Sequence, residues 1–142
     1  MSIANATPHQ SSSESSTGID TDNIPKSNQI VFVITGFGPF HGVDDNPTTI
    51  LVHKLQDYVT LKNIPVRIVA IRVLKVAADA VRREIDDIYS NFIDKGGYGR
   101  VIVIHLGVSV KATKFKLERY AYNNATFRVP DEDDFQPKEG ET

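Results

Sequence analysis

The chain has 142 residues, 16 basic against 18 acidic side chains, a formal net charge of -2 and no cysteine. This length corresponds to one domain, and the near balance of charge gives no electrostatic reason to expect nucleic acid or a membrane surface as a partner. Without cysteine, neither a disulfide scaffold nor a thiolate metal site is available. No apolar run is long enough to span a bilayer and no secretory signal begins the chain, so a cytoplasmic protein is expected.

Residues 1–29 are predicted to form a disordered tail. They are rich in serine and hold only isolated apolar residues, so they cannot bury enough surface to offset the cost of ordering the chain. A phosphorylated or targeting segment is the functional alternative, but serine-rich tails also arise without such a role, and we favour a tail without function. The folded domain is expected to begin at Ile30.

The next part of the chain predicts a strand and a helix. Ile30–Ile34 is a continuous β-branched and aromatic run, which is typical of a strand buried on both faces. Asn46 can cap a helix that begins at Pro47 and ends near Thr60. The apolar residues expected to share one face of this helix are Leu51, Leu55 and Tyr58.

The same alternation continues along the chain. A second strand is predicted at Val66–Ile71 and a third at Val101–Ile104, and glycines at 96 and 97 end the helix between them. The helical spacing is carried by Ala77, Val81, Ile85, Ile88 and Phe92. Alternating strands and helices predict a largely parallel sheet covered by helices, with ligands bound at the carboxyl ends of the strands. The segments that leave those ends follow Ile34 and Leu106.

The loop after the first strand contains three glycines and two aromatic rings. Phe37 and Phe40 could flank a flat, uncharged ligand, although their spacing alone favours core residues beneath the loop. A phosphate cradle is the competing functional interpretation of such a loop. It is disfavoured because Pro39 removes a donor and no Lys-Ser or Lys-Thr pair follows.

The later segment carries several charged residues. Glu118 could act as a general base, orient a histidine or form an ion pair with Arg128, and composition alone favours the ion pair. The acidic run 131–134 lacks the spacing of a calcium loop and is interpreted as a solvated turn. No two histidines have a convincing metal spacing, and His105 could serve as base to Ser109 but has no acid placed to orient it.

Two motifs resemble a known family. They are TGFGPF at 35–40, which is followed by NP at 46–47, and ERYAYNNATFRVPD at 118–131. Both resemble motifs of pyroglutamyl peptidase type I, and the sequence is most similar to that of eukaryotic, plant-like members. The resemblance extends through residues 30–137. It implies a three-layer, phosphorylase/hydrolase-like α/β fold with helices on both faces of a largely parallel sheet. It further implies peptides with N-terminal pyroglutamate as substrates, and no cofactor or metal.

The resemblance also implies roles for individual residues. Glu118 occupies the position of the glutamate that orients the family's catalytic histidine, and Arg128 matches an arginine near the site. Asn46 helps to hold the loop beside the pocket. The residues implied to line or rim this pocket are Phe37, Phe40, Val108 and Val129.

The family's cysteine nucleophile and histidine lie downstream of these motifs, and neither has a counterpart in this chain. We therefore expect residues 30–142 to be the N-terminal part of a single peptidase domain, truncated on its C-terminal side and inactive alone. A non-catalytic pyroglutamate-binding or peptide-binding remnant is one alternative. A nucleotide-binding α/β domain is the other, and the sequence predicts no oligomeric state.

Overall fold

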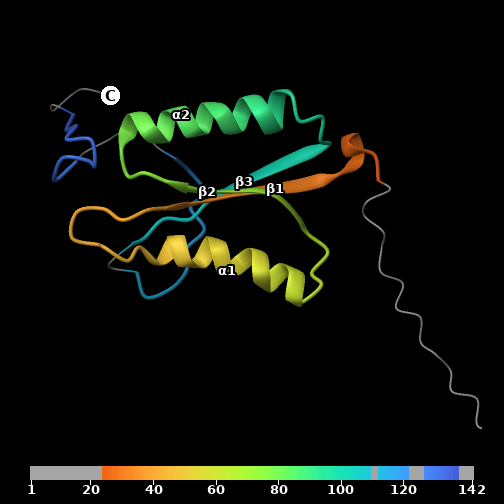
Figure 1. Ribbon diagram of the computed structural model, residues 1–142, viewed down its shortest axis with the longest axis horizontal. Helices are drawn as coiled ribbons and strands as arrows, with labels where there is room; N and C mark the ends of the chain where they lie inside the picture. Colours follow the sequence, from red (N-terminus) through yellow and green to blue (C-terminus); the bar gives the residue numbers. More distant parts are fainter. Residues whose placement is uncertain (1–23, 110–111, 122–126, 138–142) are drawn as a thin grey trace, which may run out of the picture.

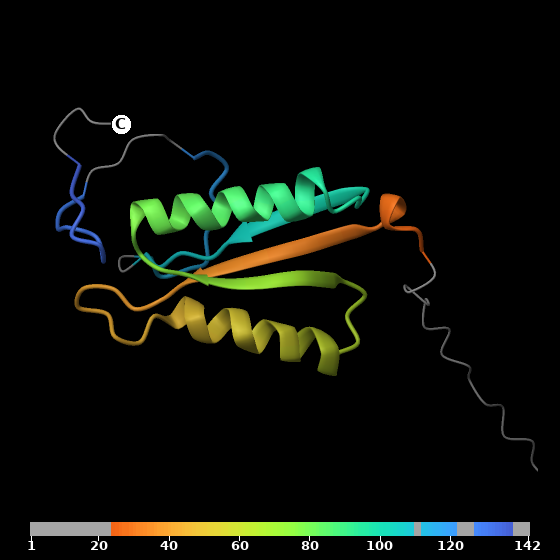
Figure 2. The ribbon, with the colours of Figure 1, turned by 45° about the horizontal axis from the view of Figure 1, so that its top comes forward.

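The computed structural model describes residues 24–109, 112–121 and 127–137 of the chain. Its centre is a three-stranded parallel sheet with the strand order β2–β1–β3. Figures 1 and 2 show one helix on each face of this sheet. The elements are β1 (Ile30–Phe37), α1 (Pro47–Leu61), β2 (Arg67–Leu74), α2 (Ala78–Ile88) and β3 (Arg100–His105). The predicted α/β fold, with its alternating strands and helices, is therefore confirmed.

β1 contributes three of the seven buried apolar residues in the part of the chain that the structure describes. Val31 and Val33 have no exposed surface, and Ile34 keeps only 3%. The strand pairs in parallel with β2 on one side and β3 on the other, so its backbone groups are satisfied within the sheet. The prediction of a strand buried on both faces is confirmed.

The buried face of α1 differs from the predicted one. Val52 is fully buried and Thr48 is 5% exposed, whereas Leu51 and Tyr58 are 38% and 53% exposed. Apolar residues lie on more than one side of this helix, so their spacing leaves its orientation open. A polar contact fixes the orientation of α1, because Oγ1 of Thr48 accepts a hydrogen bond from the Phe37 N–H at 2.8 Å. The face that Leu51 and Tyr58 share is therefore not the one that α1 buries.

α2 continues into a π-helical turn at Tyr89–Asp94. The helical pattern that extends to Phe92 therefore covers two consecutive elements. The chain leaves this turn through Gly96, where an added Cβ would lie 2.3 Å from the Phe92 carbonyl oxygen, so no larger residue fits. Within the ranges that the structure describes, no helix combines the length and apolar character needed to cross a membrane.

The end of the predicted tail has a defined conformation. Residues 1–23 lie outside the described residues, but Lys26–Asn28 form a 3₁₀ turn before β1. The Gly99 N–H donates to the Lys26 carbonyl at 3.0 Å, and an added Cβ at Gly99 would lie 2.2 Å from the Ser27 carbonyl oxygen. Residues 24–29 therefore pack beside the start of β3 rather than forming part of a disordered tail.

Candidate functional site

The loop after β1 is connected to the start of α1 by Asn46. This side chain, 3% exposed, donates from Nδ2 to the Gly38 carbonyl at 3.0 Å, and its Oδ1 accepts from the Thr48 N–H at 3.0 Å. Asparagine is a preferred helix N-cap, so one residue both begins α1 and fixes the loop. Two backbone hydrogen bonds of 3.1 and 2.7 Å close the next turn at Phe40. The loop is thus held at the carboxyl end of β1.

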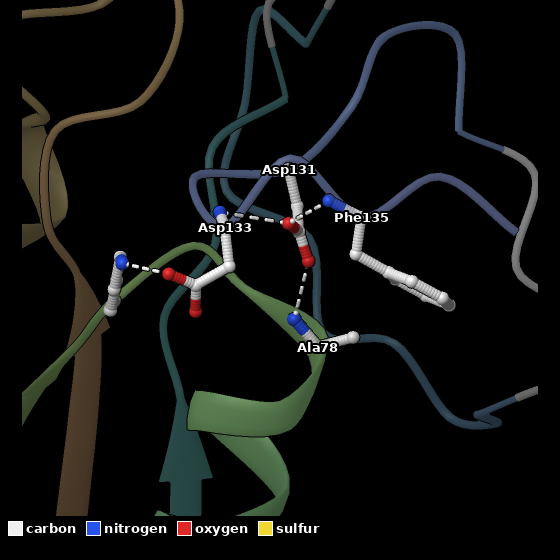
Figure 3. Close-up of polar contacts among 5 residues, drawn as sticks. Ala78, Asp131, Asp133 and Phe135 are labelled. Carbon is white, nitrogen blue, oxygen red and sulfur yellow. Dashed lines mark hydrogen bonds and ion pairs between the residues drawn. The ribbon is translucent and has the colours of Figure 1, made fainter.

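Asp131 connects a distant segment to the start of α2 (Figure 3). Its Oδ2 accepts a hydrogen bond from the Ala78 N–H at 2.8 Å, and its Oδ1 accepts from the N–H groups of Asp133 and Phe135, each at 2.9 Å. The bond from Ala78 is the main cause that lowers the pKa of Asp131 below its ordinary value of 3.8. The two turn N–H groups and the positive charge of Lys75 lower this pKa further. The carboxylate therefore stays ionised at neutral pH.

Residues 132–134 of the acidic run form an exposed turn, as expected, but the interpretation missed that Asp131 also caps α2. Figures 1 and 2 show segment 127–137 beside the start of α2. One sequence signal could have indicated this cap. Ala77 occupies the N-cap position of α2 and offers no side-chain acceptor, so the helix needs an acceptor from elsewhere.

Glu132 extends the connection across to the loop after β1. Its N–H donates to the Val76 carbonyl at 3.0 Å, and its Oε1 accepts from the His41 N–H at 2.8 Å. Asp133 adds an ion pair with Lys75. Three segments, namely the loop after β1, the β2–α2 junction and residues 127–135, are thereby joined at one end of the sheet.

A cavity of about 470 Å³ lies between these three segments. Such a volume is within the range of small-molecule sites. Its walls are mainly apolar, with charged groups from residues 128, 131 and 132. The lining residues are Phe37, Phe40, His41, Val76, Ala77, Ala78, Val81, Phe127, Arg128, Val129, Pro130, Asp131 and Glu132.

The structure brings four of the expected pocket residues together. Phe37, at the end of β1, and Phe40, in the loop that follows, line the cavity together with Arg128 and Val129. Asn46 does not line it but holds the loop through Gly38, at the place expected for it. The positions of these residues do not test their functional roles, which stay predictions.

Glu118 and Val108 are not among the residues that line the cavity. Glu118 is exposed on an irregular segment in which Leu117 is 98% exposed. Val108, 40% exposed, follows β3. Their implied roles beside a catalytic site also stay predictions.

The loop after β1 offers few donors to an anion. Its N–H groups at Phe37, Gly38, Phe40 and His41 donate to protein acceptors at 2.8, 2.8, 3.1 and 2.8 Å. The N-terminus of α1 is capped by Asn46 and that of α2 by Asp131. A phosphate cradle requires several free N–H groups, so this arrangement disfavours the nucleotide-binding alternative.

His105 ends β3 outside this cavity. Its Nδ1 forms a hydrogen bond of 2.8 Å with Oγ1 of Thr35, which is fully buried. Desolvation lowers the pKa of the ring below its ordinary value of 6.5. The polar partner of this ring nitrogen is therefore Thr35, on the neighbouring strand.

Comparisons with known proteins agree on one family. Residues 30–142 match the sequence model of the family described as pyroglutamyl peptidase. The pyrrolidone-carboxylate peptidase of Thermococcus litoralis (strain ATCC 51850 / DSM 5473 / JCM 8560 / NS-C) is 32% identical over 105 residues, which cover 74% of this chain and 43% of that protein. The enzyme of the same name from Staphylococcus aureus (strain bovine RF122 / ET3-1) is 29% identical over 105 residues, which cover 74% of this chain and 44% of that protein.

The chain spans less than half the length of these curated relatives. No solved structure matches it. The resemblance to this family noted from the two motifs is confirmed, whereas the closer likeness to eukaryotic members stays a prediction.

Proposed function

Because the chain belongs to the pyroglutamyl peptidase family, we propose that its cavity of about 470 Å³ receives the N-terminal pyroglutamyl residue of a peptide. A pyroglutamyl residue is a cyclic lactam that carries no charged amine. The site should therefore bury a flat, neutral ring rather than pair with an ammonium group. The cytoplasm is the location proposed for this activity.

The convergence of Phe37 and Phe40 with Val129 on one cavity carries this proposal. Aromatic and aliphatic walls favour a neutral ring because they gain from its burial and offer no counter-charge. The Asp131 carboxylate also lines the cavity, but three backbone N–H groups and Lys75 already surround it. An ammonium group would therefore find little uncompensated charge there.

Arg128 is the residue proposed to favour developing negative charge at the scissile carbonyl. It lines the cavity and is solvent-exposed. Its guanidinium carries a positive charge and presents several N–H donors, which suits that task. Glu118 is proposed to orient the catalytic histidine, and this role requires it to lie nearer the cavity in the catalytic state than it does here.

Hydrolysis by this family's chemistry needs a thiol that attacks the amide carbonyl. The 142 residues contain no cysteine, so we expect this polypeptide alone to bind substrate without cleaving it. The measurement is dye release from a pyroglutamyl-coupled chromogenic substrate by the purified chain. Turnover that follows the protein through purification would contradict this expectation.

Binding of pyroglutamate itself tests the pocket. Calorimetry with the free acid and its amide should show saturable binding to the folded chain. The substitution Phe40→Ala should weaken it about tenfold, since a lost aromatic contact costs roughly 1.4 kcal/mol in such sites. Phe115→Ala is the matched control because Phe115 is 97% exposed and does not line the cavity.

The outcomes separate the candidate functions. Binding without turnover supports a pyroglutamate-binding role for these residues, which is the second candidate function. Absence of binding in a chain that unfolds cooperatively would contradict the proposed pocket. Saturable binding of ATP by a chain that does not bind pyroglutamate would favour the nucleotide-binding alternative.

A further inference from the structure

One wall of the cavity belongs to no helix or strand. This wall segment, residues 127–132, includes Arg128 and Val129, and its backbone is irregular throughout. It therefore has no ladder of backbone hydrogen bonds to fix its place. Its position must come from individual contacts with the rest of the molecule.

Asp131 makes contacts of two kinds. Oδ1 accepts the N–H groups of Asp133 and Phe135, and the backbone of Asp131 adds hydrogen bonds with Phe135 and Asp134 at 2.8 and 3.0 Å. These bonds shape the turn that follows the wall segment. Oδ2 binds the Ala78 N–H and so attaches this turn to α2.

Residues 132 and 133 also attach this part of the chain to the rest of the molecule. The ion pair between Lys75 and Asp133 joins side chains that are 50% and 43% exposed, and such pairs contribute little in water. Glu132 contacts Val76 and His41, but its place in the chain is directly after Asp131. Asp131 accepts three charge-assisted hydrogen bonds and Glu132 accepts one, and such bonds are stronger than neutral ones.

We infer that Asp131 is a positioning residue of the site: its carboxylate holds the wall segment between α2 and the loop after β1, and the cavity keeps its shape only while these bonds are formed. The inference rests on the proposed function for its link to pyroglutamate. The hydrogen bonds of Asp131 themselves do not depend on the proposed function.

Two substitutions break the attachment from opposite sides. Asp131→Asn keeps the size of the side chain but replaces one acceptor oxygen by an NH₂ group. Ala78→Pro removes the N–H that Oδ2 accepts, and proline is tolerated there because Ala78 is the first residue of α2. Ala77 before it has φ -143° and ψ 134°, which is the extended conformation that a following proline requires.

Asp134→Asn is the matched control. It changes the same charge within the same turn, and Asp134 is exposed and is not among the residues that line the cavity of about 470 Å³. Its φ of 59° is one that asparagine adopts readily.

The His41 N–H is the informative reporter for amide hydrogen exchange in the 142-residue chain. It binds Glu132 and not Asp131, so loss of a helix cap alone would leave it protected. We expect Asp131→Asn and Ala78→Pro to lower protection at His41 by about tenfold or more, while Asp134→Asn leaves it unchanged. Undiminished protection of Val31 and Val33 in β1 verifies that each variant is folded.

Retained protection of His41 in both folded variants would overturn the inference. A ligand measurement tests its functional part. Pyroglutamate should bind the two variants at least about tenfold more weakly than wild type and the control. If wild type itself binds no pyroglutamate, the proposed function fails, and the exchange of His41 still decides whether Asp131 positions the wall segment.

Discussion

Asn46 shows how much one buried polar side chain can organise. Its Nδ2 is the donor to the Gly38 carbonyl, and its Oδ1 accepts from both the N–H and the Oγ1 of Thr48, the latter at 2.8 Å. The residue therefore acts on the loop and on the helix at once. Removing it should affect both.

We expect Asn46→Ala to lower the free energy of unfolding by about 1–2 kcal/mol from the lost cap, with a further cost for the Gly38 carbonyl left without its donor. Urea denaturation measures the change. Asn46→Asp separates the two contributions, because it keeps the acceptor for Thr48 and removes the donor to Gly38. The exposed Asp45→Ala is the control, and an equal loss in Asp45→Ala and Asn46→Ala would show that Asn46 has no special role.

At the scale of elements, the contact between β1 and α1 depends on Gly36. A Cβ at this position would lie 2.7 Å from the Thr48 carbonyl oxygen and 3.0 Å from Cγ1 of Val52. The first of these atoms belongs to the helix backbone. A larger residue must therefore displace α1 from the sheet.

Gly36→Ala should destabilise the chain by roughly 1–3 kcal/mol, the usual cost of overpacking. The midpoint of urea unfolding measures it. Gly107→Ala serves as control because a Cβ there meets nothing within 4 Å. If Gly36→Ala unfolds at the wild-type midpoint, α1 and β1 are less tightly packed than their contact implies.

The elements differ in how far the sequence could predict them. Continuous apolar runs indicated the strands, because a strand buried on both faces needs no polar alternation. The orientation of α1 was not predictable, since its apolar residues fit two faces and Thr48 decides between them through Phe37. The cap of α2 was missed because Asp131 lies 53 residues from Ala78 along the chain.

The candidate site, too, was predictable from the sequence only in part. Its aromatic residues were identified through a family resemblance, whereas their spacing alone favoured core positions. Composition could not show that Arg128 and Val129 line one cavity with Phe37 and Phe40, because the two pairs lie far apart in the sequence. Local patterns thus predict elements, and long-range hydrogen bonds set their arrangement.

At the scale of the whole molecule, two groups with lowered pKa values link stability to pH. The pKa of His105 is lowered by desolvation, and that of Asp131 mainly by the Ala78 N–H. In both cases the unfolded chain binds protons more readily than the folded chain. Stability must therefore fall as the pH falls, in separate ranges for the two groups.

The range of His105 begins near its ordinary pKa of 6.5 and extends downward to the lowered value in the folded state. Above this pH range the His105 ring is neutral in both the folded and the unfolded chain, and it has no effect on stability. Within the range, the ring takes up a proton in the unfolded chain but stays neutral in the folded one. We expect the free energy of unfolding to decline as the pH falls through about 6.5 and below it, toward the lowered pKa of the folded state. His105→Asn, which can still bond Thr35, should flatten this decline, and the exposed His53→Asn on α1 is the control. Urea denaturation at each pH measures the slope, and a wild-type slope in His105→Asn would assign the effect to other groups.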